Sequence, residues 1–415
     1  MASSLRGTAL RLAVSTASRR LPAHIRFPLQ RDGVDPVPRL EASRAGGDVV
    51  RLTRLLGTRV WLVTGYDAAR AVLADSASFA NDVRHLIGRQ DRAPAERIGG
   101  LGMTDSPDHE RLRRVLTPYF TRRRLVDLQA DVDRVVGDAL DDMAAHGPEV
   151  DLVERFGFAV PFGVICDLLG MPEVDRLEFR HAGAARFDLR DGSARIFDTA
   201  AGTRQFLIDL VASERHAPHL PDGLVARMVA DHGADFDDVE LGGLADGVFL
   251  GGYETSASML SLGTFVLLRH PAAWKTLQRG EPAEVDQVVE ELLRFVCPVQ
   301  VAFPRIARRD LGVGEQAVRA GDIVVVSLTG AGRDPARHID AAHFDPTTAA
   351  AGTLAFGHGL HRCVGAELAR MELRTALVAL ARRFPDLSLA CDPGDLRFTE
   401  LAIVHGVEAL PVRLG

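Results

Sequence analysis

Apolar residues recur at three- and four-residue spacing along most of this chain, which predicts helices that each bury one face. The pattern holds through residues 125–230, where few strand signals occur. It is longest at residues 237–270, where two aspartates can cap the start and no proline follows until Pro271. We therefore expect a helix of about thirty residues there, which is long for a globular protein.

Strand-type patterns are short and few. Residues 49–56 and 59–64 are β-rich runs on either side of Gly57, which predicts a hairpin. Residues 298–305 form an extended segment that leads into strand pieces ending at Val326, and residues 400–405 form a turn between strands. The expected fold class is mainly α with small β-sheets.

The composition narrows the class of protein. The chain has 415 residues, enough for two or three domains of ordinary size, and 47% hydrophobic with 25% charged residues is typical of a soluble globular protein. A net charge of −7 argues against nucleic acid as a partner. The four scattered cysteines form no disulfide framework, which predicts a cytoplasmic protein. No apolar stretch reaches the roughly 20 residues of a membrane span.

The N-terminus differs from the rest of the chain. Arginines and serines are frequent before Asp32, which is the first acidic residue. This composition is similar to that of an organelle transit peptide, and it equally fits an arginine-rich extension of a bacterial protein. We favour the second interpretation and place the extension at residues 1–27.

A glycine-rich loop at residues 356–365 contains Cys363 and is followed by an apolar helical pattern. Amide groups and the helix dipole at a helix N-terminus favour a thiolate, and a thiolate held there is suited to be an axial metal ligand. Two other interpretations remain. The cysteine could be buried and inert, or it could form a zinc site with His358 and His361.

This loop resembles the haem-binding signature of the cytochrome P-450 monooxygenases, soluble bacterial type. The matching positions are Phe356, Gly357, Gly359, His361, Cys363 and Gly365. The resemblance implies a haem b cofactor whose iron is bound by Cys363. It also implies that the haem lies between the long central helix and the helix after the cysteine loop.

A second stretch of the family lies within the long helix. Two adjacent glycines inside a helix cost about 1 kcal/mol each relative to alanine, so space for a flat cofactor at Gly251 is a reasonable compensation. The pair Glu254 and Thr255 resembles the acid–alcohol pair of the family, which implies that Thr255 supports bound dioxygen and Glu254 relays protons. Leu250 would face the substrate. The alternative is a bent helix with a solvated Glu254 and a back-bonded Thr255.

His109 and Arg113 lie four residues apart on a predicted helix, so they share one face. Asp105 or Ser106 can cap this helix. By resemblance, His109 and Arg113 would hold the haem propionates, together with Arg305 and His361. The alternative is a solvated charged face.

Glu291 and Arg294 resemble the structural Glu-x-x-Arg pair of the family. The arginine that completes this network is expected near residues 344–348, where threonines stand instead, so Arg333 and Arg337 are candidates to replace it.

The family also implies which residues line the substrate pocket. They are Val301, Ala302 and Ile403, in addition to Leu250. The glycine-rich residues 82–103 and the segment 177–225 would form a loop and a lid near the substrate. For the apolar side chains among these residues, simple core packing is the alternative.

Together the motifs imply one cytochrome P-450 domain over residues 28–415, because motifs from both halves must meet at one haem. The implied function is insertion of one oxygen atom from O2 into a lipophilic small molecule, by hydroxylation or epoxidation, in bacterial secondary metabolism. We see no flavin or iron–sulfur module, so a ferredoxin and a ferredoxin reductase are the expected electron donors. The arginines at 122–124 could dock such an acidic partner.

Three other functions remain: a haem-thiolate sensor, a peroxide-driven or non-oxygenating haem-thiolate enzyme, and a zinc protein. The acid–alcohol pair argues against the first two, since neither needs a proton relay to dioxygen.

Overall fold

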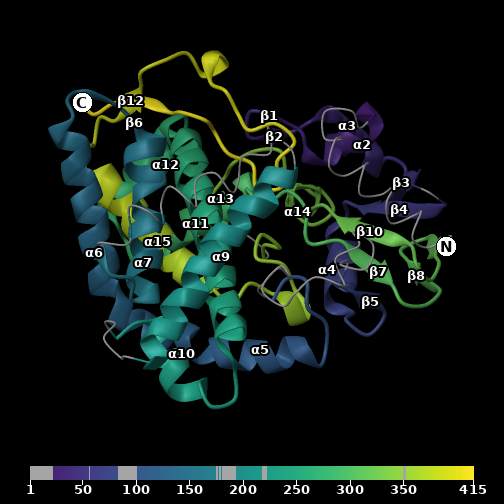
Figure 1. Cartoon of the computed structure of the whole chain (residues 1–415). Coiled ribbons are helices and arrows are strands. Elements are labelled where there is room, and N and C mark those ends of the chain that lie inside the picture. The colour runs from purple at the N-terminus through teal and green to yellow at the C-terminus, as the bar shows by residue number, and fades with distance from the viewer. Residues whose placement is uncertain are drawn as a thin grey trace.

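The long helix predicted from the hydrophobic pattern runs through the middle of the molecule (Figure 1). The computed structural model describes residues 22–55, 57–82, 101–173, 176, 179, 193–216, 222–348 and 352–415. Its α-helices are α2 (Ala23–Arg26), α3 (Pro38–Arg44), α4 (Tyr66–Ala74), α5 (Asp108–Leu116), α6 (Arg122–Ala145), α7 (Ala159–Leu169), α9 (Ser193–His216), α10 (Leu224–His232), α11 (Asp238–Leu268), α12 (Pro271–Arg279), α13 (Pro282–Val296), α14 (Leu328–Gly332) and α15 (Ala366–Arg383).

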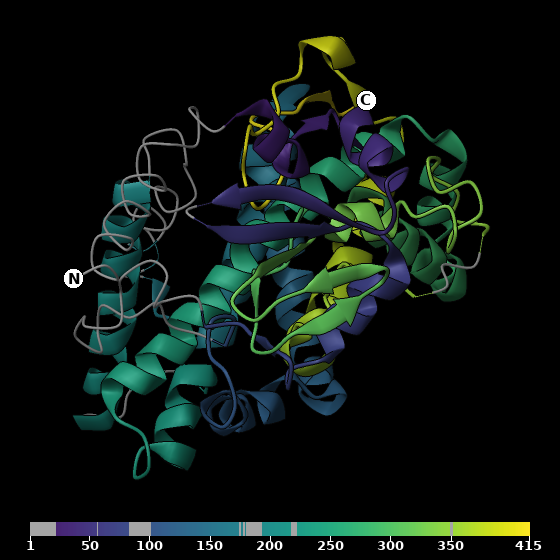
Figure 2. The same cartoon turned by 90° about the vertical axis from the view of Figure 1, so that its right-hand side faces the viewer.

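The strands are short and gather in small sheets. They are β1 (Arg31–Asp32), β2 (Asp35–Pro36), β3 (Val49–Leu55), β4 (Thr58–Val63), β5 (Phe79–Ala80), β6 (Glu149–Asp151), β7 (Arg305–Ala307), β8 (Leu311–Val313), β9 (Gln316–Val318), β10 (Ile323–Val326), β11 (Ser388–Leu389) and β12 (Pro411–Arg413). The largest sheet has the order β3-β4-β10-β7-β5 and faces the viewer in Figure 2. The predicted hairpin is confirmed as β3 and β4, with Gly57 at φ 90° in the turn. The predicted fold class is also confirmed.

The sequence explains the course of α11. Asp237 accepts a hydrogen bond from the amide of Glu240, whose side chain bonds back to the amide of Asp237, so both residues satisfy helix-end amides. Glycines let other helices approach closely. A Cβ on Gly242 would lie 2.7 Å from the Cα of Ile208 in α9, and one on Gly252 would lie 2.9 Å from Ile165 in α7. Gly252 is therefore explained by helix packing, whereas a Cβ on Gly251 would meet no atom within 4 Å.

The start of α5 differs from the prediction. The helix begins at Asp108, and its N-cap position is Pro107, with no side-chain cap. The Asp105 carboxylate instead accepts hydrogen bonds from the amides of Asn81 (2.8 Å) and Asp82 (3.3 Å). The prediction that Asp105 or Ser106 caps this helix is wrong, because Asp105 is used to tie the preceding loop to the end of β5.

Two predicted segments lie mostly outside the described residues. The predicted loop at 82–103 is described only at 82 and 101–103, and the predicted lid at 177–225 is described only at 179, 193–216 and 222–225.

Glu372 on α15 is a buried carboxyl group. It is 3% exposed, its Oε1 has no hydrogen-bond partner, and burial raises its pKa from 4.5 to about 8. Between these two values the folded protein holds a proton that the unfolded chain has released. The free energy of unfolding therefore falls as the pH rises through this window, by at most about 1.4 kcal/mol per pH unit from this group.

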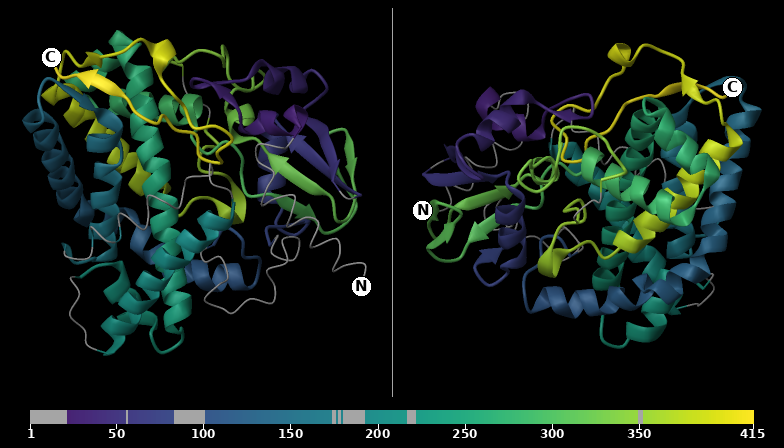
Figure 3. Two further views of the ribbon diagram at one scale, coloured as in Figure 1. Left: turned by 45° about the horizontal axis from the view of Figure 1, so that its top comes forward. Right: turned by 180° about the vertical axis from the view of Figure 1, so that it is seen from behind.

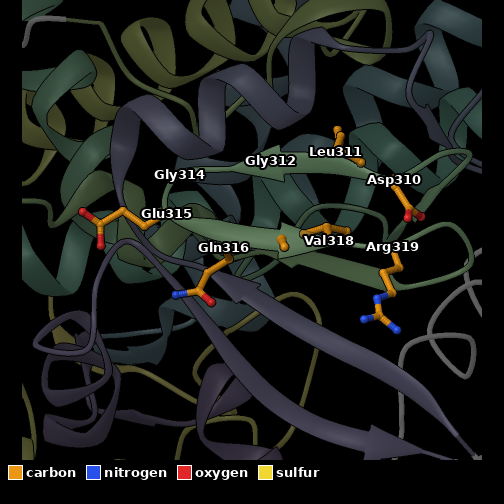
Figure 4. A pocket seen from close by; sticks show the side chains of 9 residues that line it. Asp310, Leu311, Gly312, Gly314, Glu315, Gln316, Val318 and Arg319 are labelled. Atoms are coloured by element: carbon orange, nitrogen blue, oxygen red, sulfur yellow. The ribbon is translucent and has the colours of Figure 1, made fainter.

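We expect Glu372→Gln to remove this dependence, so that the variant gains stability over the parent protein as the pH rises from about 5 to 8. Denaturant unfolding at several pH values measures the effect. Glu315→Gln is the control, since Glu315 is exposed at the tip of the β8–β9 hairpin, beside a shallow surface hollow of about 350 Å³ (Figure 4). Equal pH profiles for the Glu372 variant and the parent would contradict the prediction.

Candidate active site

The cysteine loop is shaped by glycines and backbone hydrogen bonds. Gly357 and Gly359 have φ values of 68° and 72°, which disfavour other residues. A Cβ on Gly359 would also lie 2.6 Å from the Leu73 carbonyl oxygen in α4, so this glycine lets the loop touch α4. The amide of Cys363 donates to the carbonyl of Phe356 at 2.9 Å, and α15 begins three residues later. The predicted position of the cysteine, just before a helix, is confirmed.

The Cys363 thiol is accessible to solvent, but it is surrounded by enough protein for burial to raise its pKa. A hydrogen bond from the Gly365 backbone and the charges of Arg113, Arg362 and Arg370 act in the opposite direction and are weaker. The Gly365 backbone bond acts in the direction that was expected of amides at this helix start, but the effect of burial on the pKa is larger. A metal ion bound to the sulfur supplies the missing positive charge and deprotonates a coordinating thiol.

Three groups that can carry positive charge converge beside this loop. His109 of α5 is 0% exposed, and its ring centroid lies 4.2 Å from that of His361. Arg305 of β7 is buried near His361 and donates from Nη1 to the Phe303 carbonyl at 2.7 Å. Burial lowers the pKa of His361 to about 4, that of Arg305 to about 10 and that of His109 below its usual value.

Several ring nitrogens in this cluster lack hydrogen-bond partners. They are both nitrogens of His109 and Nδ1 of His361. A buried polar group without a partner costs about 1–3 kcal/mol, and each neutral imidazole ring carries one N–H donor, so the cluster fits an anionic ligand that would accept a hydrogen bond from these rings. Haem propionates are such anions.

Arg113 points to the cysteine loop itself. Its Nη1 donates to the carbonyls of Leu360 at 3.1 Å and Arg362 at 2.7 Å. Arg113 therefore connects α5 to the segment that carries Cys363. Its predicted contact with a propionate would use the remaining nitrogens of the guanidinium group.

The middle of α11 presents a polar pair next to an exposed glycine. Gly251 is exposed although Phe249 and Tyr253 around it are buried. Thr255 Oγ1 donates to the Gly251 carbonyl at 2.6 Å, as the back-bonded alternative anticipated. Glu254 differs from that alternative, because it is half-buried, and burial raises its pKa to about 8. At neutral pH the Glu254 carboxyl therefore carries a proton.

The predicted substrate-contact residues are partly accessible. Leu250, Val301 and Ala302 are half-buried, and Ile403 is 55% exposed. Sequence reasoning missed Phe303, which is 49% exposed and lies against Gly102, where a Cβ would come within 2.5 Å of its ring. The signal was present, since alternate residues of an extended segment share a face and Phe303 follows Val301 at that spacing.

Glu291 and Arg294 of α13 form an ion pair, as predicted, and the structure shows that both residues are buried. Arg294 donates from Nε and Nη2 to the two carboxylate oxygens at 2.7 and 2.6 Å, and further to the carbonyls of Gly332, Ala341 and His343.

The expected third arginine is absent from this network in the described part of the chain. The Asp345 amide donates to Glu291 Oε1 at 2.9 Å instead. Arg333 bonds to the carbonyls of Phe295 and Ala342 and to Asp35, and Arg337 lies over the Tyr66 ring. A backbone amide thus replaces the arginine side chain.

These residues fit a haem-thiolate site. Cys363 offers a sulfur ligand, His109, His361 and Arg305 offer donors for propionates, and the helix that carries Glu254 is accessible at Gly251. The zinc interpretation is wrong: within the described residues, which include His358, His361 and Cys363, no three potential metal ligands come together.

Comparison with known proteins identifies the family. Residues 284–393 match the family model for cytochrome P-450. Cytochrome P-450 165C4 of Amycolatopsis orientalis is 36% identical over 400 residues, which cover 95% of this chain and 97% of that protein. The chain belongs to the cytochrome P-450 family.

Further relatives of this cytochrome P-450 support the same family assignment. The monooxygenase PikC of Streptomyces venezuelae is 37% identical over 382 residues, 91% of each chain. The crystal structure of OxyC, implicated in an oxidative C–C coupling during vancomycin biosynthesis, matches with a TM-score of 0.84 and 34% identity, over 94% of this chain and 96% of OxyC. The family implies an oxidoreductase with a haem-thiolate cofactor. In the described part of this cytochrome P-450, no helix is long and apolar enough to cross a membrane.

Proposed function

We propose that this cytochrome P-450 binds haem b through Cys363 and inserts one oxygen atom from O2 into a lipophilic small molecule, by hydroxylation or epoxidation. The observation that carries the proposal is the accessible Cys363 beside a buried cluster of ring nitrogens without hydrogen-bond partners, in a chain that also carries the Glu254–Thr255 pair on α11. Thiolate-bound haem supplies the activation of dioxygen.

The protein residues supply binding and proton control. His109, His361 and Arg305 hold the propionates. Arg113 fixes the cysteine loop through its hydrogen bonds to two carbonyls of that loop. Phe356 and Gly365 shape the loop around the sulfur. Burial raises the pKa of Glu254 to about 8, which favours a protonated carboxyl that can serve as the proton source beside Thr255 in the sequence.

The proposed substrate class is a lipophilic molecule of bacterial secondary metabolism. Val301, Ala302 and Ile403, with Leu250 and the additional Phe303, offer an apolar surface with accessible side chains. The similarity to OxyC, which is implicated in a coupling reaction during vancomycin biosynthesis, supports the metabolic setting.

A ferredoxin and its reductase are the proposed electron donors, in the cytoplasm. Exposed arginines at 122, 123 and 124 begin α6, which packs beside α15 through a hydrogen bond between Gln129 and Thr375. Arg362 is exposed next to Cys363. On a protein of net charge −7, these arginines are suited to dock an acidic partner. We also propose residues 28–415 as one domain, since residues from both halves meet at the site, with residues 1–27 as an extension.

A second candidate function is oxidative coupling of two carbons within the substrate. The OxyC relative, implicated in such a coupling, favours it. The two functions differ in their products, because coupling removes two hydrogens and adds no oxygen.

The decisive experiment reconstitutes the holoenzyme with a ferredoxin, its reductase, a nicotinamide donor and heavy-isotope dioxygen. Substrates are chosen by the spin-state shift they induce in the haem spectrum. A product with one heavy oxygen atom supports the proposal. A product that has lost two hydrogens without oxygen supports coupling, and product formation only with added peroxide supports the peroxide-driven alternative.

We expect Thr255→Ala to retain haem but to lower the coupling of electron consumption to product by about tenfold or more, with hydrogen peroxide released instead. The reason is loss of the hydroxyl beside Glu254. Peroxide and product are measured per nicotinamide oxidised. Ser261→Ala is the matched control, since Ser261 makes the same type of bond, to the Ala257 carbonyl at 2.8 Å, on the buried part of α11. If the Thr255 variant forms as much product per nicotinamide oxidised as the parent protein, the Thr255 hydroxyl has no role in the use of dioxygen.

A further inference from the structure

We propose that Arg31 and Gln300 are positioning residues that set the shape of the substrate pocket, although neither belongs to its apolar lining. The inference rests on the proposed function, because it takes residues 301–303 and Ile403 as substrate contacts. We call residues 301–303 the first substrate wall and residues 402–403 the second.

Gln300 connects the two walls directly. It is 1% exposed and precedes the first wall. Its backbone amide donates to the Ile403 carbonyl at 2.9 Å, and its side-chain Nε2 donates to the Ala402 carbonyl at 2.7 Å. One residue thus bonds to both peptide groups of the second wall.

Arg31 holds Gln300 from the N-terminal side of the chain. Its Nε donates to Gln300 Oε1 at 3.1 Å. The other nitrogens donate to the carbonyls of Val34, Val296 and Cys297 and to Thr329 Oγ1. All of these acceptors are neutral. Burial is the main cause that lowers the pKa of this guanidinium, to about 10. The half-buried guanidinium thus donates to the Gln300 side chain, to backbone carbonyls and to one hydroxyl close to the first wall.

The backbone at both walls is strained, which explains why they need such support. Among the described residues, three residues other than glycine have positive φ: Cys297 (38°), Leu401 (52°) and Asp340 (54°). Two of these lie at this network. Cys297 precedes the first wall by four residues and its carbonyl accepts from Arg31, whereas Leu401 directly precedes the second wall. A left-handed conformation is unfavourable for residues other than glycine, so the hydrogen bonds of Arg31 and Gln300 oppose relaxation of the segments that lead into both walls.

The β1–β2 region and the segment around His405 meet at this point. His405 Nε2 bonds to the Gly33 carbonyl at 2.7 Å, and the His405 amide donates to the Pro298 carbonyl at 2.8 Å. Figures 1 and 3 show the C-terminal segment in yellow beside the N-terminal β1 and β2 in purple. The position of the walls therefore depends on a residue of the N-terminal turn, about 270 positions away from Gln300 in sequence.

The test compares two iron-binding probes on the purified holoenzyme. Imidazole is small and needs little of the pocket, whereas a bulky azole such as econazole must contact the walls. We expect Gln300→Met and Arg31→Met to weaken econazole binding by about tenfold, the equivalent of one or two hydrogen bonds, and to change imidazole binding less than about twofold. The reduced carbon monoxide spectrum of a thiolate-bound haem should remain.

Two further variants distinguish a change in the shape of the pocket from a general loss of stability of the fold. Gln300→Glu keeps an acceptor for Arg31 and loses the donor to Ala402, so we expect an intermediate loss of econazole affinity, and it serves if the methionine variants do not fold. Arg44→Met is the control, since Arg44 also binds an N-terminal helix to α14, through the carbonyls of Gly330 and Arg333, and touches neither wall.

The outcomes divide clearly. A selective loss for econazole in the Gln300 and Arg31 variants, absent in Arg44→Met, supports the inference. Equal losses for both probes, no loss for either, or the same selective loss in Arg44→Met overturns it. A parent protein without the thiolate-type spectrum would instead refute the proposed function, and is visible before any variant is made.

Discussion

Replacing Cys363 by alanine is expected to abolish the red-shifted Soret band that a thiolate-bound haem shows after reduction and addition of carbon monoxide. The sulfur is the only atom of the cysteine loop that can serve as a soft ligand to iron, and it lies at the start of α15 with its backbone fixed by the Phe356 carbonyl. Activity with ferredoxin should be lost completely, because no other group activates dioxygen.

The fold should survive this change. Cys363 is accessible to solvent and its amide bond to Phe356 does not need the side chain, so the variant should remain soluble and helical by circular dichroism. Cys391→Ala is the control, since Cys391 is half-exposed and lies outside the site. A variant at position 363 that retains the shifted band, or a Cys391 variant that loses it, would assign the iron ligand to another residue.

Arg294→Ala is expected to give the largest loss of stability, about 3–5 kcal/mol, because it leaves the Glu291 carboxylate buried without its charge partner. Arg294 is 4% exposed and Glu291 is 1% exposed. The substitution also removes the donors for the carbonyls of Gly332, at the end of α14, and of Ala341 and His343, in the segment that follows α14. We therefore expect poor haem retention as well.

Denaturant unfolding and the ratio of haem to protein after purification measure these effects. Arg374→Ala is the matched control: Arg374 pairs with Asp286 at 3.0 Å on the surface, and loss of such a pair costs about 0–1 kcal/mol. If the two variants were equally stable, the buried pair would contribute no more than a surface pair. Normal haem content in an Arg294 variant of low stability would separate folding from cofactor binding.

The ionisation state of the Cys363 sulfur bears on the first of these two predictions. Burial raises the pKa of Cys363 despite three arginines nearby, so the protein by itself favours the thiol. A metal ion bound to the sulfur would favour the thiolate. Burial also raises the pKa of the Glu254 carboxyl, to about 8.

Local patterns in the sequence were sufficient for the elements that carry the chemistry. The capping pair at Asp237 and Glu240 and the absence of proline determined α11, and the glycines of the cysteine loop with the apolar pattern after Cys363 determined α15. Such features depend on residues that are close in sequence, where capping, periodicity and turn chemistry act. The buried pair of Glu291 and Arg294 was predictable for the same reason, since three residues separate its members.

Contacts between distant segments were decided only by the tertiary structure. The sequence did not predict that Asp105 binds the end of β5 instead of capping α5, or that the Asp345 amide replaces an arginine at Glu291. Nor did it predict the bonds of Arg31 to Gln300 and of Gln300 to the C-terminal turn. Each of these hydrogen bonds joins residues that are far apart in the sequence, so no local sequence pattern links them. The strength of each bond also depends on burial, which exists only after the helices and sheets have packed.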